Sequence, residues 1–302
     1  MVQVATFYRF ATVPDPGAFK AALAAASVSS GVRGSILIAP EGVNGTIAGA
    51  AMDVRRVLDR IRAEPGFNDL RVAWSEAGAP PFGRLKIRIK REIVTMGRPG
   101  LDPAAVGTRV APADWNALIA APDVAVIDTR NAYETAIGTF DGAIDPGTER
   151  FGDFPDWWAA NAARFADKRI AMFCTGGIRC EKSTAFLKSQ GVADVYHLDG
   201  GILSYLDAIP AGQSRWRGAC FVFDERVAVG HGLRETAHTL CRACRRPVSP
   251  ADLSTLEYEP GTRCAACKNE YSAADRARFR ERHRQVQLAE ARGARHLAPG
   301  SG

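Results

Sequence analysis

The sequence contains no long hydrophobic run and no recognisable export segment. No apolar stretch in its 302 residues approaches the ~18 residues that a membrane-spanning helix needs. The first residues, MVQVATFYRF, lack the basic start and extended apolar stretch of a signal peptide. We therefore expect a cytoplasmic protein with no membrane partner, in which thiols stay reduced. With 46% hydrophobic and 24% charged residues, the chain is composed like a soluble protein of two or three domains.

Histidine is also scarce, which limits the cofactors that the sequence indicates. The five histidines are scattered, and we expect each to be a surface or core residue. There is no cluster of two histidines and a carboxylate, and no dinucleotide-binding fingerprint, so the sequence identifies no organic cofactor. Seven cysteines are present, and in a reducing compartment they indicate chemistry or metal binding rather than disulfides.

The first third of the chain predicts a ferredoxin-like α+β domain, with limits 1–94. The helix expected over 51–63 has one apolar face, formed by Val54, Val57, Leu58 and Ile61. A second helix is predicted over 16–28, and strands over 2–9, 34–39, 45–49 and 70–74. The order strand–helix–strand–strand–helix–strand is typical of this fold.

A further strand, LKIRIKREI at 85–93, carries a row of cations. Side chains alternate between the faces of a strand, so one face presents Arg84, Lys86, Arg88 and Lys90. This face is either a solvated outer surface or a patch that binds phosphates, which dominate nucleic-acid affinity. The net charge of +6 is compatible with an anionic partner.

The middle of the chain changes to the pattern of a parallel α/β domain. Residues 95–112 are rich in Gly and Pro and read as a linker. In the predicted domain, 113–212, short apolar strands alternate with helices, and the strands at 124–128 and 169–174 end in Asp128 and Cys174. Ligands of such sheets bind beyond the carboxyl ends of the strands. We therefore expect substrate contacts from Asp128 and from nearby Arg130.

The segment FCTGGIRCEKS, 173–183, predicts a reactive thiol. Gly176 and Gly177 permit positive φ and let backbone N–H groups surround an anion, and Arg179 can add a charged fork. The following helix presents its positive end. A thiol in this setting is expected to be a thiolate, which makes Cys174 the candidate nucleophile. Cys180 either resolves a Cys174 persulfide or disulfide, or is a small residue that packs the start of the helix.

The remaining residues, 213–302, form a tail with two Cys-x2-Cys pairs. Cys241 and Cys244 are separated by nineteen residues from Cys264 and Cys267, a spacing that fits a tetrahedral structural zinc ribbon. The alternative is four free cysteines or a redox pair. An arginine-dense helix follows, read either as a solvated terminal helix or as a second phosphate contact. Its arginines are Arg276, Arg278, Arg280, Arg282 and Arg284.

Several of these segments resemble known families. The arrangement Cys-x4-Arg at a strand–loop–helix junction resembles the active-site loop of the rhodanese superfamily, and DTRNAYE (128–134) and LDGGI (198–202) are similar to other rhodanese segments. In rhodaneses the loop cysteine carries a persulfide. Related phosphatases have a loop one residue longer, so the resemblance argues against a phosphatase.

The whole string CTGGIRCEK resembles a narrower family, the bacterial tRNA uridine 5-hydroxylases. APEGVNGTI (39–47), LKIRIKREIV (85–94) and FVFDERV (221–227) are also similar to that family, and the resemblance spans residues 2–230. It implies an acylphosphatase-like domain, then a rhodanese domain, then a cysteine-bearing tail. It also implies oxygen-dependent conversion of wobble uridine 34 of tRNA to 5-hydroxyuridine, with Cys174 as the active-site cysteine.

The first hypothesis is therefore a tRNA-modifying hydroxylase with molecular oxygen as co-substrate, in which the anticodon loop of tRNA would contact the basic strand and its uridine would turn toward Cys174. A persulfide sulfurtransferase with no RNA substrate is the second hypothesis, since Cys174 alone would suffice for it. A non-catalytic adaptor, with the zinc ribbon and basic surfaces as binding sites, is the third.

Overall fold

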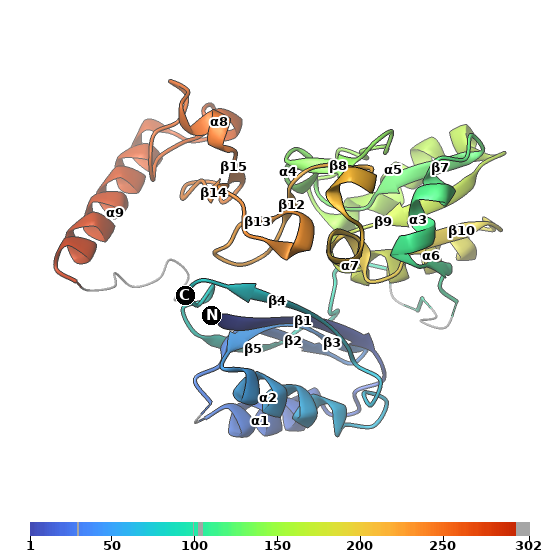
Figure 1. Cartoon of the computed structure of the whole chain (residues 1–302), viewed down its shortest axis with the longest axis horizontal. Helices are drawn as coiled ribbons and strands as arrows, with labels where there is room; N and C mark the ends of the chain where they lie inside the picture. The colour runs from blue at the N-terminus through green and yellow to red at the C-terminus, as the bar shows by residue number, and fades with distance from the viewer. Residues whose placement is uncertain (29, 99, 102–104, 294–302) are drawn as a thin grey trace.

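The first domain is a mixed, mainly antiparallel sheet covered on one face by two helices (Figure 1). In the computed structural model, which describes residues 1–28, 30–98, 100–101 and 105–293, the strand order is β4-β1-β3-β2-β5. The first four strands have the ferredoxin-like order, and β5 joins the edge in parallel with β2. The elements are β1 (Val2–Phe10), α1 (Pro16–Ser27), β2 (Arg33–Ala39), β3 (Gly42–Gly49), α2 (Ala51–Arg62), β4 (Arg71–Ala77) and β5 (Leu85–Ile89).

Local chemistry explains where α1 begins and which side α2 buries. The Asp15 carboxylate accepts a hydrogen bond from the Ala18 N–H at 2.9 Å, and Pro16 occupies the first turn of α1. In α2 the predicted apolar face is fully buried, because these side chains pack against the sheet in one apolar core.

The second domain contains the expected parallel sheet, in the order β6-β10-β9-β7 (Figure 1). Its strands are β6 (Thr108–Val110), β7 (Val124–Asp128), β9 (Arg169–Phe173) and β10 (Val195–Leu198). Its helices are α3 (Pro112–Ile119), α4 (Ala132–Thr135), α5 (Phe154–Asn161), α6 (Ile178–Ser189) and α7 (Gly201–Ala208), with 3-10 turns η1 (Phe151–Asp153), η2 (Ala162–Phe165) and η3 (Ala211–Gln213). A separate pair is formed by β8 (Gly138–Phe140) and β11 (Trp216–Gly218).

The basic strand is shorter than predicted, ending at Ile89 instead of at residue 93. The Lys90 N–H still bonds to the Ile38 carbonyl at 2.8 Å, but the Ile93 N–H bonds to the Glu41 side chain at 2.7 Å. The Glu92 carboxylate accepts the N–H groups of Met96 and Gly97. Side-chain acceptors thus replace the ladder and turn the chain out of the sheet. The predicted linker lies partly on residues 99 and 102–104, outside the described part of the chain.

The tail is built from short elements around the cysteines, followed by one long helix. These elements are β12 (Cys220–Phe221), β13 (Ala228–Val229), η4 (His231–Leu233), β14 (Thr239–Leu240), β15 (Pro247–Val248), α8 (Pro250–Leu253), η5 (Ala265–Cys267) and α9 (Ala273–Ala291). Every residue of α9 is described, and none is fully buried. The end of the predicted tail, 294–302, lies outside the described residues. Over the described ranges, no helix combines the length and apolar character of a membrane span.

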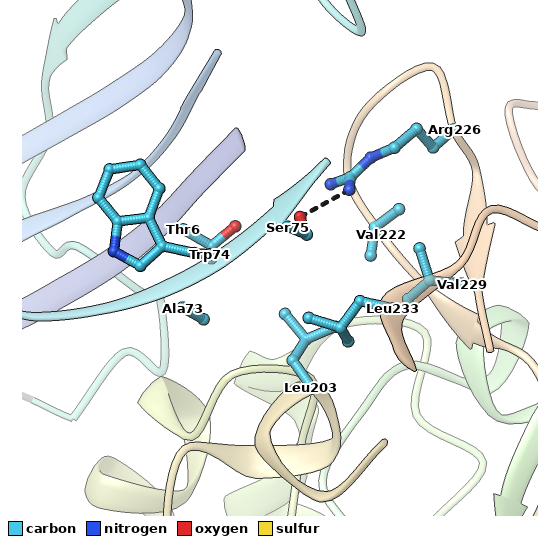
Figure 2. Close-up of a pocket in the computed structure, with 9 residues that line it drawn as sticks. All are labelled: Thr6, Ala73, Trp74, Ser75, Leu203, Val222, Arg226, Val229 and Leu233. Atoms are coloured by element: carbon cyan, nitrogen blue, oxygen red, sulfur yellow. Dashed lines mark hydrogen bonds between the residues drawn. The ribbon is translucent and has the colours of Figure 1, made fainter. Parts of the chain in front are cut away.

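The open face of the first sheet packs on α7 and on the β12–β13 segment (Figure 1). At this contact the Arg226 Nη1 donates to the Ser75 hydroxyl at 2.8 Å, and apolar side chains such as Leu203 and Val222 close the remaining space (Figure 2). The void left there measures about 10 Å³, about the size of one water probe. The two domains are therefore in tight contact along this face.

Candidate active site

Cys174 follows β9 directly and lies at the bottom of a tight loop that leads into α6. Its side chain is fully buried. The Gly177 N–H donates to the Cys174 Sγ at 3.1 Å, and Gly177 has φ 97°, in the region that favours glycine. Gly176, by contrast, does not have a positive φ, so only one of the two loop glycines is required for this conformation. The loop thus directs backbone donors at the sulfur, as the sequence predicts.

The LDGGI segment holds the same loop from its other side. The Ile202 N–H bonds to the Cys174 carbonyl at 2.9 Å, and the Leu203 N–H bonds to the Thr175 carbonyl at 3.0 Å. A Cβ on Gly201 would lie 2.4 Å from the Cys174 carbonyl oxygen, too close for any side chain. The first turn of α7 therefore needs glycine to approach the loop.

Arg179 lies in the loop but is held by a carboxylate that the sequence analysis did not assign. Its Nη1 and Nη2 donate to the two oxygens of Glu134 at 2.5 and 2.9 Å. The Glu134 side chain is 0% exposed and that of Arg179 is 8% exposed. The forked pair is therefore buried, and the Arg179 charge reaches the sulfur from a fixed position rather than as a free anion-binding fork.

These surroundings shift the pKa values of the two loop thiols in opposite directions. Burial alone would raise the pKa of Cys174. A hydrogen bond from the Cys180 thiol, the Arg179 charge and the backbone N–H groups of Cys180 and Arg179 outweigh burial and lower that pKa to about 6. Burial and the neighbouring Cys174 raise the pKa of Cys180. Cys174 is therefore the thiolate at neutral pH, and Cys180 is its protonated neighbour.

The structure does not support Asp128 and Arg130 as substrate-binding residues. Both side chains are 0% exposed. Arg130 Nε and Nη2 donate to the Asp128 carboxylate at 2.9 and 2.6 Å, and Nη2 also donates to the Gly138 carbonyl at 2.6 Å. With their charges paired and their hydrogen-bonding groups occupied inside the domain, these residues brace the β7–α4 turn that carries Glu134. The prediction overlooked this pairing, because a position at the end of a strand does not show whether a residue binds substrate or stabilises the fold.

A cavity of about 420 Å³ lies between the two domains near the start of α6. Its described lining includes Phe10, Arg91, Glu92 and Lys182. Lys182 is held by carboxylates of the first domain, with Nζ 2.8 Å from Glu41 and 2.6 Å from Glu92. The volume is in the range of small-ligand sites. The cavity joins the end of the basic strand to the helix that follows the Cys174 loop.

Matches to known proteins agree with this domain order. A family model described as "UPF0176 acylphosphatase like domain" matches residues 2–93, and a rhodanese-like domain model matches residues 111–208. Proteins named tRNA uridine(34) hydroxylase are similar over nearly their whole length. That of Jannaschia sp. (strain CCS1) is 61% identical, over 99% of this chain and 100% of its own. The chain belongs to the tRNA uridine(34) hydroxylase family.

Further members of this family show the same extent of similarity. The tRNA uridine(34) hydroxylase of Ruegeria pomeroyi is 58% identical over 99% of both chains, and that of Caulobacter vibrioides is 54% identical over 98% of this chain and 96% of its own. Among solved structures, a rhodanese-like domain protein from Staphylococcus aureus has 24% identity and a TM-score of 0.28, covering 32% of this chain and 90% of its own.

The segments that resemble the hydroxylase family have structural roles at the domain boundary. Asn44, in APEGVNGTI, donates to the Ile93 carbonyl at 3.0 Å, and Glu41 of the same segment reaches Lys182. In FVFDERV, Asp224 and Arg226 form a buried pair at 2.7 Å, which aims Arg226 at Ser75. Glu41 therefore fixes the first domain against the rhodanese domain, and Arg226 fixes it against the start of the tail.

The four basic residues predicted for the strand differ in how available they are for binding phosphate. Arg88 and Lys90 are exposed at the free edge of the sheet. Arg84 and Lys86 already interact with other groups of the chain. The five arginines of α9 are likewise engaged, with Glu259, Asp275 and Glu281 or with the carbonyls of Arg242 and Lys268. The basic strand is thus the more available phosphate surface of the two.

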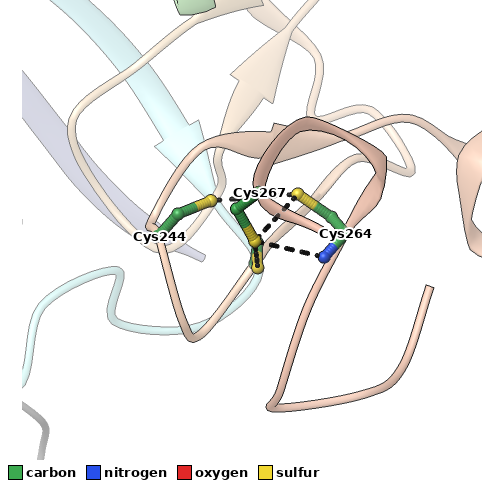
Figure 3. A group of neighbouring side chains, drawn as sticks. Cys244, Cys264 and Cys267 are labelled. Atoms are coloured by element: carbon green, nitrogen blue, oxygen red, sulfur yellow. Dashed lines mark hydrogen bonds between the residues drawn. The ribbon is translucent and has the colours of Figure 1, made fainter. Parts of the chain in front are cut away.

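The four tail cysteines form a cluster suited to a metal ion (Figure 3). Their sulfurs all lie within 4.8 Å of one another, and three of the separations are 3.8 Å. Four thiolates placed ~2.3 Å from a tetrahedral zinc would lie about 3.8 Å apart, so the cluster fits this ion. Within the described residues, this is the single group of three or more potential ligands placed to hold a metal.

Sequence reasoning missed several residues of the site, among them Glu134, Glu181, Lys182 and Tyr8. Glu134 lies inside the DTRNAYE segment, so the resemblance to rhodaneses held a clue to it. Tyr8 had no such clue, since its hydroxyl meets Glu181 across 173 residues of sequence.

Proposed function

We propose that the protein hydroxylates uridine 34 of tRNA to 5-hydroxyuridine in an oxygen-dependent reaction, with Cys174 as the active-site cysteine. The observation that carries this proposal is the buried thiolate loop in a chain 61% identical to a tRNA uridine(34) hydroxylase over 99% of its length. The product, the role of oxygen and the anticodon loop as the recognised part of the tRNA belong to the proposal. So do a cytoplasmic location and the domain limits 1–94, 113–212 and 213–302.

The surfaces that lead to the start of α6 support an RNA substrate. Arg88 lies on the edge strand β5 and Lys90 directly after it, where the chain leads toward the cavity of about 420 Å³. Phosphates would follow the strand, while an unstacked base entered the cavity beside Phe10, whose ring offers a stacking surface. Bases of an anticodon loop are unpaired, so presenting one there requires little unpairing.

In the mechanism, the chain's own residues prepare the sulfur and its surroundings. The Gly177 N–H and the charge of Arg179 keep Cys174 ionised, while Glu134 holds Arg179 in place. Cys180, protonated and buried, stands ready as a second thiol. In the tail, Cys241, Cys244, Cys264 and Cys267 would hold a structural zinc. With all four positions filled by protein, this ion would stabilise the tail fold and take no part in the reaction.

The decisive experiment incubates purified protein with unmodified tRNA under air and under argon. Nucleosides are then analysed by mass spectrometry, and Cys174→Ser serves as the inactive control. We expect 5-hydroxyuridine at position 34 under air only, and none with the variant. Equal product under argon would refute the role of oxygen, and no product under air would refute the proposed activity.

Binding of tRNA through the basic strand is tested by its salt dependence. Arg88→Ala with Lys90→Ala should reduce the slope of log Kd against log salt by the amount that about two phosphate contacts contribute. Lys20→Ala with Arg55→Ala is the matched control, because these exposed cations lie on α1 and α2, the opposite layer of the domain. Equal slopes for the two pairs would remove the strand from the RNA surface.

A persulfide sulfurtransferase remains the second candidate, favoured by the short loop that surrounds the Cys174 sulfur with donors. It predicts rapid transfer of sulfur from thiosulfate or a protein persulfide to an acceptor, independent of RNA. Slow transfer from both donors, or transfer that depends on tRNA, would exclude it.

A further inference from the structure

The first domain places one side chain directly against the catalytic loop of the second. Tyr8, on β1, points from the open face of its sheet, and its hydroxyl donates to the Glu181 Oε1 at 3.0 Å. The same hydroxyl would lie 2.8 Å from a Cβ on Gly177, so it touches the residue whose N–H is directed at Cys174. Tyr8 of the first domain thus lies against the Cys174 loop of the rhodanese domain.

Glu181 lies in the first turn of α6, and its N–H bonds to the carbonyl of Gly177 in the Cys174 loop at 3.2 Å. Its side chain is 11% exposed, and two donors bond to the same carboxylate oxygen. One is Tyr8, and the other is the Arg109 Nη2 at 2.8 Å. The two hydrogen bonds together fix the Glu181 carboxylate in place.

We propose that Tyr8 is a positioning residue of the active site: its hydroxyl, together with Arg109, holds Glu181 and Gly177 so that the loop donors stay directed at the Cys174 sulfur. The active site is then formed by both domains, and the acylphosphatase-like domain contributes to the reactivity of the thiol as well as to RNA binding. This inference rests on the proposed role of Cys174 but not on the identity of the substrate.

Tyr8 differs from the charged groups near Cys174 because its phenol stays uncharged. Burial, followed by the charges of Glu181 and Cys174, holds the pKa of Tyr8 well above its usual range. The phenol therefore keeps its proton and acts as a donor throughout the physiological range. The groups that act on the Cys174 sulfur are Arg179 and Cys180 on α6, and Arg179 is held in turn by Glu134 on α4.

Removing the hydroxyl should therefore disfavour the thiolate. In Tyr8→Phe the ring stays, but the Glu181 carboxylate loses one donor and Gly177 loses its neighbour. We expect the pKa of Cys174 to rise by about half a unit, which is about a threefold fall in the ratio of thiolate to thiol. Glu181→Gln should shift the pKa in the opposite direction, because it removes a negative charge from the first turn of the helix that follows Cys174.

The pKa is measured on the full-length protein by iodoacetamide labelling across pH. Trypsin cleaves after Arg169 and Arg179, so the peptide 170–179 contains Cys174 alone, separate from Cys180. The difference in thiolate absorbance near 240 nm between each variant and its Cys174→Ser counterpart measures the same ionisation without requiring access of the reagent. The matched control is Arg71→Gln, which breaks another contact between the domains, the 2.6 Å pair with Asp199.

Opposite shifts for Tyr8→Phe and Glu181→Gln, with no shift for Arg71→Gln, would support the proposal. If Tyr8 only tethers the domains, Arg71→Gln would shift the pKa as much as Tyr8→Phe does, and the proposal fails. An unchanged Cys174 pKa in Tyr8→Phe also overturns it while leaving the proposed function intact. If Cys174 titrates like an ordinary thiol in the unaltered protein, that result contradicts its proposed role as the active-site cysteine. The inference about Tyr8 then fails as well.

Discussion

Replacing Glu134 by alanine tests whether the buried carboxylate holds the active-site loop. The change leaves the Arg179 guanidinium, 8% exposed, without the two hydrogen bonds of 2.5 and 2.9 Å that now satisfy it. Breaking a buried ion pair from one side costs about 3–5 kcal/mol, because the remaining charge stays buried. With an m-value of ~2 kcal/mol/M, the lower figure moves the urea midpoint down by about 1.5 M.

A double variant separates stability from reactivity. Glu134→Leu with Arg179→Met removes both charges and fills the space with apolar groups, which is often close to neutral for stability. We expect it to recover most of the urea midpoint but not the low pKa of Cys174, because the Arg179 charge is gone. The reasoning would be refuted by a Glu134→Ala midpoint within about 0.3 M of the parent, or by a double variant as unstable as the single one.

The same pair predicts a pH dependence with a definite sign. Burial would raise the pKa of Glu134, but Arg179 and then Arg130 outweigh it and hold that pKa below its usual range. The stabilisation is therefore present above the unfolded-state pKa of ~4.3 and is lost as the pH falls through the folded-state pKa. The gap in urea midpoint between the parent and Glu134→Ala should narrow once the pH drops below about 4.

Three further predictions concern other parts of the molecule. Activity that depends on Cys174 should rise with pH through a midpoint near its pKa of about 6, because the thiolate predominates above that value; a pH–rate profile with a midpoint above about 8 would contradict this. Gly201→Ala should lower the free energy of unfolding, measured by urea titration, by at least ~1 kcal/mol, because the φ of Gly201 is 64° and the new Cβ would meet the Cys174 carbonyl. Gly176→Ala is the control: this glycine has open space around it, so the variant should unfold like the parent. Cys264→Ala should reduce bound zinc, measured by elemental analysis, from about one ion per chain to almost none, and should expose the tail to proteolysis while Cys174 labelling stays unchanged.

The sequence predicted those parts of the fold that depend on local pattern. The apolar face of α2, the buried strand that leads directly into Cys174 and the paired Cys-x2-Cys spacing are each encoded within short segments, and the structure confirms them. The basic strand was predicted too long, because alternation continues to residue 93 while the Glu41 side chain captures the Ile93 N–H from a distant segment.

The site was harder to predict, because charge pairing depends on contacts between distant segments. Asp128 and Arg130 look like ligands at a strand end, and their sequence does not reveal that each satisfies the other in the interior. Arg179 was expected to bind an anion, but its partner, Glu134, comes from 45 residues earlier in the chain. Residue types at the carboxyl end of the sheet thus indicated where the candidate site lies. Which charged side chains pair with one another there could not be predicted, because the partners come from distant segments.

Lys182 links the two domains through its charge. Its side chain is 8% exposed, and its acceptors are Glu41, Glu92 and the Val94 carbonyl, all outside the rhodanese domain. A rhodanese fragment cut free at the linker would leave all three acceptors behind, and this cation would then depend on water for its hydrogen bonds. An unrelated domain docked on the same face of α6 would bury Lys182 again and would have to supply new acceptors for it. Grafting a different first domain onto the rhodanese domain would therefore require either such acceptors or the replacement of Lys182.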